Sequence, residues 1–272
     1  MKRYLPFIGL LVVFGMPVAP LSAQTATSSG EPAADLAAAN DASQKATGTT
    51  PARKGSAFSR FIKDVGSDYK NFFSKETAIW YGAGLGAAGL VHLADDEIRE
   101  ALEDPSEPAM HAFEGGDKYG NVSVQLPLAV GWWALGSAFG SARGADAGRD
   151  LLRAQINAAT WTYAIKFAVN RTRPNGDPRS FPSGHASAAF ATAMVLQEHY
   201  GWKVGLPFFA GATYTGLSRI SADKHWASDV VFGAAVGMAS ARTVTLHLRR
   251  HKITLAPFSV PRGGGLALML VD

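Results

Sequence analysis

Long apolar segments dominate the chain after residue 76, and they limit the folds that it can adopt. Each segment is long enough for several helical turns and contains few helix-breaking residues. We therefore expect helices over residues 77–94, 122–142, 150–169, 185–200, 204–217 and 227–248. Their small residues, glycine and alanine, would allow neighbouring helices to approach each other closely. The sequence predicts an all-α bundle of about six helices, with a polar, turn-rich stretch over residues 97–116.

The first 23 residues have the pattern of an export signal. Lys2 and Arg3 precede an apolar stretch over residues 5–18, and small residues lead up to position 23. The alternative is a first membrane anchor, but two prolines and a core shorter than the roughly 20 residues of a membrane span argue against it. With either interpretation the rest of the chain is exported. We expect it in the periplasm or on the periplasmic side of a bacterial envelope membrane.

The chain then divides into a linker, a helical domain and a tail. Residues 24–57 are rich in Ala, Ser, Thr, Gly and Pro and contain no aromatic residue before Phe58, which predicts a disordered linker. Aromatic and charged residues alternate over residues 58–75 in a pattern that suits an amphipathic helix packed on the domain or on a membrane surface. We place the helical domain at residues 58–250.

The tail, residues 251–272, has a different pattern. Apolar residues at 253, 255, 266, 268 and 270 alternate with other residues on both sides of a glycine-rich segment at 261–265. This pattern predicts a short β-hairpin with a glycine turn.

Three clusters of charged residues stand out in the otherwise apolar second half. In the first, Lys166 and Arg173 are seven residues apart, or two helical turns, so one helix face could carry both. Pro174 disfavours further helix, which predicts that Arg173 projects from a helix end. Taken alone, the pair is better explained by a lysine that extends to the surface and an arginine that stabilises a helix end.

The second cluster is Phe181-Pro-Ser-Gly-His185, which opens an alanine-rich segment. Ser183 can cap the helix that follows, and the exposed backbone N–H groups at a helix start attract anions. An ordinary helix cap accounts for Ser183 well. It accounts poorly for His185, because a histidine at that point faces whatever the helix start binds.

The third cluster places Arg219 before His225 and Asp229. The last two are four residues apart, a spacing that puts them one above the other on a helix. A carboxylate there can accept from one imidazole nitrogen and leave the other free as a nucleophile. In isolation, a weak surface pair would explain the same spacing.

Together the clusters resemble the type-2 phosphatidic acid phosphatases, which are related to bacterial non-specific acid phosphatases and vanadium haloperoxidases. That family carries Lys-x6-Arg-Pro, then Pro-Ser-Gly-His, then Ser-Arg-x5-His-x3-Asp. All three motifs are complete here, and the resemblance covers roughly residues 77–248. One departure is the short link between Pro174 and Pro182, which leaves little room for a loop over the site.

The resemblance implies a role for each matching residue. The phosphate oxygens would be held by Lys166, Arg173, Arg219, the hydroxyl of Ser183 and the N–H of Gly184. His225 would attack phosphorus and form a phosphohistidine, while Asp229 orients it. His185 would protonate the leaving oxygen and then activate the hydrolytic water. Three cationic side chains take the role that Mg²⁺ has elsewhere, so no metal or other cofactor is expected.

The resemblance thus predicts a metal-independent acid phosphatase or lipid phosphate phosphatase that acts on phosphate monoesters or pyrophosphates. One alternative is a vanadate-dependent haloperoxidase, but the chain is short and the additional lysine motif of such a site is missing. Another is a catalytically silent envelope protein, but all six ionic site residues are present. The chain has no cysteine, and its net charge of +4 is too small to indicate nucleic-acid binding.

Membrane association is expected but depends on one segment. Residues 122–142 are uncharged and form the best spanning candidate. The acidic run Asp95-Asp96-Glu97 could coordinate a cation, as could His111 with Glu114, but solvated helix ends explain both better. The sequence leaves open the phosphate ester and the oligomeric state.

Overall fold

The computed structural model describes residues 57–102, 107–246, 252–260 and 263–271. The predicted export signal and the predicted linker lie outside these residues, apart from Ala57, which begins the first described helix. The described helices are α2 (Ala57–Asn71), α3 (Lys75–His92), α4 (Asp95–Leu102), α5 (Glu107–Gly120), α6 (Val122–Ala138), α7 (Ala142–Val169), α8 (Gly184–Tyr200), α9 (Trp202–Ser221) and α10 (Ala227–Thr245). The prediction of an all-α domain is confirmed, with more helices than the six expected.

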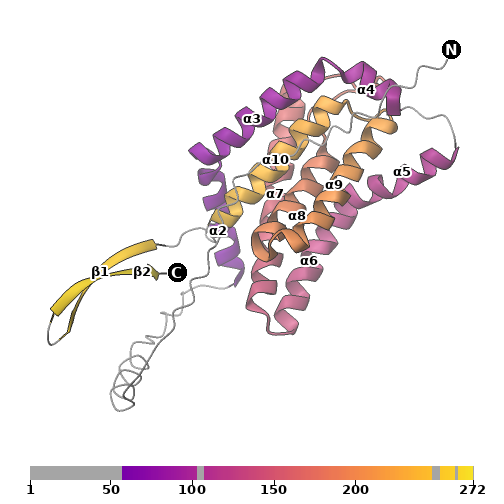
Figure 1. The fold of residues 1–272 in the computed structure, drawn as a ribbon. Coiled ribbons are helices and arrows are strands. Elements are labelled where there is room, and N and C mark those ends of the chain that lie inside the picture. The colour runs from indigo at the N-terminus through magenta and orange to yellow at the C-terminus, as the bar shows by residue number, and fades with distance from the viewer. Residues whose placement is uncertain (1–56, 103–106, 247–251, 261–262, 272) are drawn as a thin grey trace, which may run out of the picture. The chain divides into compact units, whose positions relative to one another are not determined.

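The core lies where α7, α8 and α10 meet. In the helical part of Figure 1, α8 and α10 run side by side, with α3 next to α10 and α9 next to α8. Leu151, Leu196 and Val244 are among the apolar side chains enclosed there, and all are at most 1% exposed. Burial of such side chains stabilises the fold by about 1.5–3 kcal/mol each.

Two glycines on α10 allow its close approach to α8. A Cβ atom at Gly237 would lie 2.1 Å from the carbonyl oxygen of Ser187, and one at Gly233 would lie 2.5 Å from that of Ser183. Neither distance leaves room for a side chain, because the opposing atoms belong to the backbone. The small residues therefore bring the start of α8 against α10, which is where the second and third sequence clusters lie.

The uncharged segment at residues 122–142 is not one helix. Helix α6 ends at Ala138, Gly140 adopts a left-handed conformation with φ of +67°, and Ser141 caps α7 by accepting from Gly144 N at 3.1 Å. Helix α7 therefore starts eight residues before the predicted 150 and runs for 28 residues. Among the described helices, none is both long enough and apolar enough to cross a membrane.

The stretch at residues 97–116, predicted to be turn-rich, is largely helical and contributes to α4 and α5. Asp95, Asp96 and Glu97 occupy the first turn of α4, where acidic side chains complement the helix dipole. Pro108 is the second residue of α5, where its missing N–H costs no hydrogen bond of the helix. Local sequence composition gave the wrong prediction here because these residues suit a helix start as well as a turn.

The predicted C-terminal hairpin is confirmed. Strands β1 (Lys252–Val260) and β2 (Gly263–Val271) pair antiparallel, with Leu255 opposite Leu268 and Ile253 opposite Leu270. The predicted glycine turn is misplaced, because the glycines at 263–265 lie in β2 and pair with residues 258–260. The connection itself, residues 261–262, lies outside the described residues.

Candidate active site

The three sequence clusters surround one cavity of about 480 Å³. Six of the eight predicted site residues line it, namely Lys166, Arg173, Gly184, His185, Arg219 and His225. The other two, Ser183 and Asp229, are fully buried and do not line it. The cavity is formed by the end of α7, the segment from 170 to 183, the start of α8, the end of α9 and the residues that lead into α10.

Lys166 and Arg173 do not share a helix face, contrary to the prediction. Helix α7 ends at Val169, and Asn170 caps it in a left-handed conformation with φ of 46°. The chain then leaves the helix, and the turn after Arg173 brings its N–H to within 2.8 Å of the carbonyl of Asp177. The two cations meet at the cavity because the segment folds back across the end of α7.

The ammonium group of Lys166 is tied to this segment. Nζ donates to the carbonyl oxygens of Arg179 at 2.8 Å and Ser180 at 3.1 Å. An ammonium has three hydrogens, so one remains for a ligand in the cavity. Burial lowers the pKa of Lys166 to about 8, and the neighbouring charge of Arg173 adds to this effect. A bound anion would counter both effects.

The two arginines have unsatisfied donors. The Nε atoms of Arg173 and Arg219 are buried, and no described protein group accepts a hydrogen bond from either. One amino group of Arg219 contacts the carboxylate of Asp117, which is half-exposed on α5. The cavity therefore holds more positive charge than its walls neutralise, and an anion would complete the set.

The start of α8 contributes backbone donors. Ser183 caps the helix by accepting from Ala186 N at 3.4 Å, as predicted, and its own N–H donates to the carbonyl of Asp229 at 2.9 Å. Gly184 follows at the cavity wall, and a Cβ there would meet only Thr162, at an ordinary contact distance of 3.7 Å. The first N–H groups of a helix have no partner within the helix and favour a negative charge.

His225 precedes α10, so the predicted stacking of His225 and Asp229 on one helix face is wrong. Asp229 is the third residue of α10, and its Oδ2 atom folds back to accept from Trp226 N at 2.9 Å. This capping geometry directs the carboxylate toward the residues before the helix. Nδ1 of His225 lies 3.6 Å from Oδ2 of Asp229, which leaves Nε2 as the nitrogen for the cavity.

The environment of His225 favours the neutral imidazole. Burial, together with the cations Lys166 and Arg219, lowers its pKa to about 4 against the opposing effect of Asp229. Burial alone would raise the pKa of Asp229, but its contacts with His225, Ser180, Trp226 N and Arg171 outweigh burial and hold that pKa below its usual range. Near neutral pH the pair is a neutral imidazole beside a carboxylate, as a histidine nucleophile requires.

His185 lines the same cavity as the second residue of α8. Its Nε2 atom is 3.4 Å from Oδ1 of Asp117 and 3.4 Å from Nδ2 of Asn121. Burial, together with the charge of Arg219, lowers the pKa of His185 to about 4 against the opposing effect of Asp117. A phosphate group between His185 and the three cations would raise this pKa, because it brings negative charge to the ring.

Sequence reasoning missed the residues behind His225. Arg171 donates to Oδ1 of Asp229 at 2.8 Å, and Ser180 donates to Oδ2 of the same carboxylate. Asp95, expected at a solvated helix end, is instead only 4% exposed and forms an ion pair with Arg171 at 2.9 Å. Arg171 lies within the Lys-x6-Arg-Pro motif, but no local pattern distinguishes it from a surface arginine.

Asp117 was also missed. Its carboxylate contacts both Arg219 and His185, and it lies in α5, one residue beyond the stretch expected to form turns. A carboxylate near both the arginine expected to bind phosphate and the histidine expected to act as the acid would influence both groups.

Comparison with known proteins places this site in a family context. Residues 148–252 match the PAP2 superfamily. Over 166 residues the chain is 35% identical to the lipid A 1-phosphatase of Porphyromonas gingivalis. The matched region covers 57% of this chain and 35% of that protein. Over 79 residues it is 35% identical to the lipid A 4'-phosphatase of Helicobacter pylori, which covers 29% of this chain and 40% of that protein. The chain thus spans well under half the length of these curated relatives.

The fold has a solved counterpart. A transmembrane PAP2-type phosphatidylglycerolphosphate phosphatase from Bacillus subtilis superposes with a TM-score of 0.55, over 68% of this chain and 98% of that one. The two sequences are 21% identical, so the likeness concerns the fold alone.

Proposed function

We propose that the chain, which matches the PAP2 superfamily over residues 148–252, is a metal-independent phosphatase that removes phosphate from a lipid. The observation that carries this proposal is the cavity itself. Four cationic side chains, a helix start and two histidines line one space of about 480 Å³. Cationic side chains and the N–H groups of a helix start together suit an anion that carries more than one charge, such as a phosphate group.

In the proposed mechanism the phosphate oxygens bind Lys166, Arg173 and Arg219 together with the N–H of Gly184. These donors are held in place before the substrate binds, so they stabilise the charge that develops on the transferring phosphoryl group. Ser183 does not line the cavity, so in this proposal it supports the phosphate site by capping the start of α8.

The first step transfers the phosphoryl group to His225. Nε2 attacks phosphorus with its lone pair, the bond between phosphorus and the ester oxygen breaks, and protonated His185 donates a proton to that oxygen. The released alcohol leaves, and the carboxylate of Asp229 balances the positive charge on the phosphorylated ring.

In the second step His185 acts as a base. It accepts a proton from water, whose oxygen attacks phosphorus while the bond between phosphorus and Nε2 of His225 breaks. Inorganic phosphate is released, and His185 regains the proton that it donated in the first step. A diphosphate would react in the same way, with a phosphate as the leaving group.

A lipid substrate is proposed from the mouth of the cavity and from the relatives. Tyr163 and Phe167 line the cavity and are 60% and 63% exposed. The guanidinium of Arg179 lies 4.9 Å from the centre of the Phe167 ring. Apolar rings beside a cation suit a molecule with a charged head and an apolar tail. Lipid A phosphates are the first candidates, because two similar proteins are named as lipid A phosphatases.

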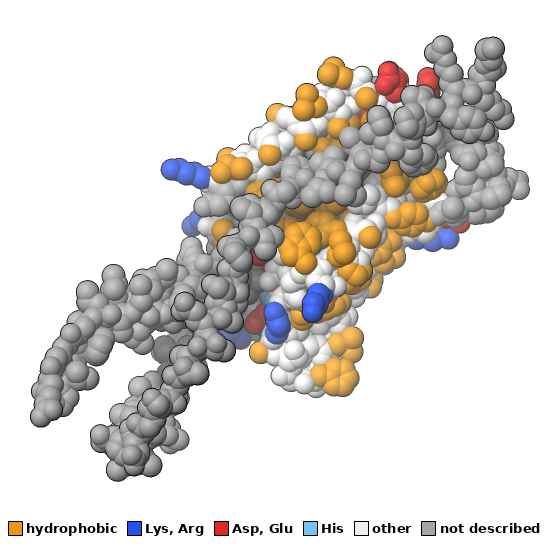
Figure 2. All heavy atoms as spheres, in the orientation of Figure 1, with side chains coloured by type: hydrophobic (Ala, Val, Ile, Leu, Met, Phe, Trp, Pro, Cys, Tyr) orange, Lys and Arg blue, Asp and Glu red, His pale blue; other side chains and the backbone are white. Residues whose placement is uncertain are grey.

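The surface supports an association with an envelope membrane. Hydrophobic side chains are exposed on the face of the helical part that Figure 2 shows. Leu90, Leu93 and Phe139 are more than 70% exposed, which is unusual for large apolar side chains in water. We propose that the protein acts after export, with its site on the periplasmic side.

The proposal is tested by replacing the nucleophile. His225→Ala should reduce hydrolysis of a soluble phosphomonoester to background, and brief incubation of the wild-type protein with a ³²P-labelled substrate should trap an acid-labile phosphoprotein that the variant lacks. His199→Gln is the matched control, because His199 pairs with Asp150 at 2.9 Å and is equally buried but does not line the cavity. Undiminished turnover in His225→Ala would refute the mechanism.

A further inference from the structure

Arg171 does not line the proposed phosphate cavity but faces the carboxylate behind it. One amino group, Nη1, donates to Oδ1 of Asp229 at 2.8 Å and to Oγ of Ser228 at 2.7 Å. The guanidinium also lies 5.3 Å from the centre of the Trp226 ring, and Trp226 Nε1 donates to the carbonyl of Thr172 at 2.9 Å. Arg171 therefore connects the segment after α7 to the residues that carry His225 and Asp229.

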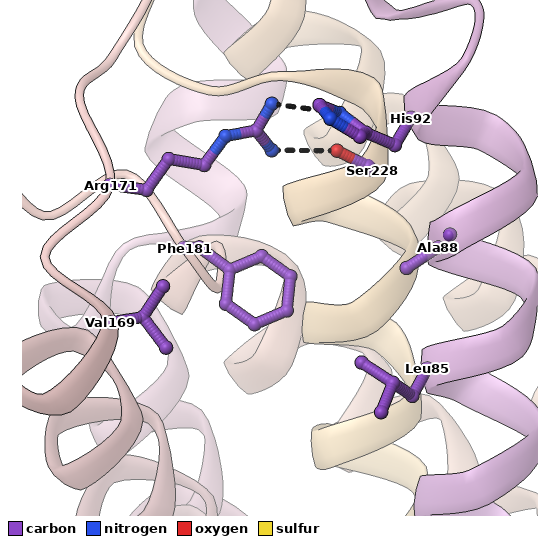
Figure 3. Close-up of a pocket in the computed structure, with 8 residues that line it drawn as sticks. Leu85, Ala88, His92, Val169, Arg171, Phe181 and Ser228 are labelled. Atoms are coloured by element: carbon purple, nitrogen blue, oxygen red, sulfur yellow. Dashed lines mark hydrogen bonds between the residues drawn. The ribbon is translucent and has the colours of Figure 1, made fainter.

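A second carboxylate holds Arg171 from the other side. Nη2 donates to Oδ2 of Asp95 at 2.9 Å, and Asp95 also accepts from the N–H of Ser228 at 2.9 Å and from its hydroxyl at 2.7 Å. Figure 3 shows Arg171 extending toward His92 and Ser228, beside a cavity of about 350 Å³ with apolar walls. Nδ1 of His92 lies 3.1 Å from Nη2 of Arg171 and 2.8 Å from Oδ2 of Asp95.

We propose that Arg171 and Asp95 are positioning residues that fix the carboxylate of Asp229 and thereby orient His225 for attack. This inference rests on the proposed function. It adds to the proposed site two residues that do not line the phosphate cavity. The carboxylate of Asp229 accepts from Arg171 on one oxygen and from Ser180 and Trp226 N on the other. Its orientation is therefore set without any hydrogen bond to His225, whose Nδ1 is 3.6 Å away.

The charges of this chain of residues match the reaction. Two carboxylates, Asp95 and Asp229, face the single guanidinium of Arg171, which leaves one negative charge in excess. That excess is balanced when His225 becomes cationic, as it does on phosphorylation. Ionisable groups on other elements also act on these residues. Lys166 on α7 and Arg219 on α9 act on His225, and His92 at the end of α3 contacts Asp95.

The test compares two substitutions at one position. Arg171→Gln removes the charge and the fork of donors, whereas Arg171→Lys keeps the charge. We expect Arg171→Gln to lower kcat by about tenfold to a hundredfold with little change in KM, as loss of an outer partner does at metal sites. The acid limb of its kcat/KM profile should move to higher pH, since Asp229 loses the cation that lowers its pKa. Arg171→Lys should retain the acid limb and recover part of kcat.

A control separates positioning from loss of stability. Arg153 forms a buried ion pair with Asp68 away from the cavity, so Arg153→Gln should lower the melting temperature and leave the acid limb unchanged. An Arg171→Gln variant that behaves like Arg153→Gln in all respects would overturn the inference.

A second measurement does not depend on turnover. In ¹³C-labelled protein, the imidazole resonance of His225, assigned with His225→Gln, should titrate at higher pH in Arg171→Gln than in the wild type. If the wild type hydrolyses no phosphate ester, the proposed function fails while this shift still supports the coupling. If turnover depends on His225 but the titration and the acid limb do not move, only the inference about Arg171 fails.

Discussion

Gly233 offers a direct test of how packing between helices builds the site. A Cβ atom at this position would lie 2.5 Å from the carbonyl oxygen of Ser183 and 3.2 Å from its nitrogen. Ordinary van der Waals contact begins at 3.4 Å, so α10 must move about 1 Å away from the start of α8 to accommodate alanine. The neighbouring atoms are backbone, which cannot rotate aside.

The expected cost follows from two opposing terms. Overpacking a tight contact costs about 1–3 kcal/mol, and replacing glycine by alanine within a helix returns about 1 kcal/mol. We therefore expect Gly233→Ala to lower the free energy of unfolding by about 1 kcal/mol. The effect on activity should be larger, because a displacement of about 1 Å of reacting groups can reduce a rate by about a hundredfold.

The assay is kcat/KM for a soluble phosphomonoester, measured together with urea unfolding. Gly82→Ala is the matched control, because a Cβ at this helical position on α3 meets no atom within 4 Å. It should stabilise the protein by about 0.5–1 kcal/mol and leave activity unchanged. If Gly233→Ala is as active as Gly82→Ala, the contact between α8 and α10 does not position the residues of the proposed phosphate site, and the reasoning is refuted.

The remaining predictions concern charge at the cavity. Burial lowers the pKa of Lys166 to about 8, so its side chain is cationic below that pH and loses its charge above it. The inhibition constant of inorganic phosphate should therefore rise as the pH passes 8. An inhibition constant that stays flat to pH 9.5 would argue against contact between Lys166 and phosphate. Asp117→Asn should bind phosphate more tightly, because Arg219 loses a competing carboxylate. The same change should move the basic limb of kcat to lower pH by about 1 unit, because Asp117 raises the pKa of His185; an unshifted limb would mean that His185 is not the acid.

The sequence by itself determined the class of fold and predicted a set of candidate site residues. The long apolar segments were expected to be buried as helices, and helices account for the described chain before the hairpin apart from the segment from 170 to 183, caps and short connections. The three motifs are recognised from short spacings along the sequence, so their residues could be predicted as one set. The structure places six of them around one cavity, namely Lys166, Arg173, Gly184, His185, Arg219 and His225.

Local spacing predicted the geometry less well than the residues. His225 and Asp229 are neighbours because the side chain of Asp229 folds back to cap α10, not because they share a helix face. Likewise, Lys166 and Arg173 meet because the chain folds back after Val169. In both cases a short-range pattern indicated the correct contact for the wrong structural reason.

Only the tertiary structure decided what surrounds the motif residues. Asp95 and Arg171 are 76 residues apart in the sequence, and Asp117 is 102 residues from Arg219. Such pairs depend on which helices pack together, and that packing is set by long-range contacts such as those of Gly233 and Gly237 with the backbone of α8. A sequence pattern gives information about residues that are close along the chain. The burial of Asp95 and the hydrogen bond from Arg171 to Asp229 result instead from helices that the whole core brings together.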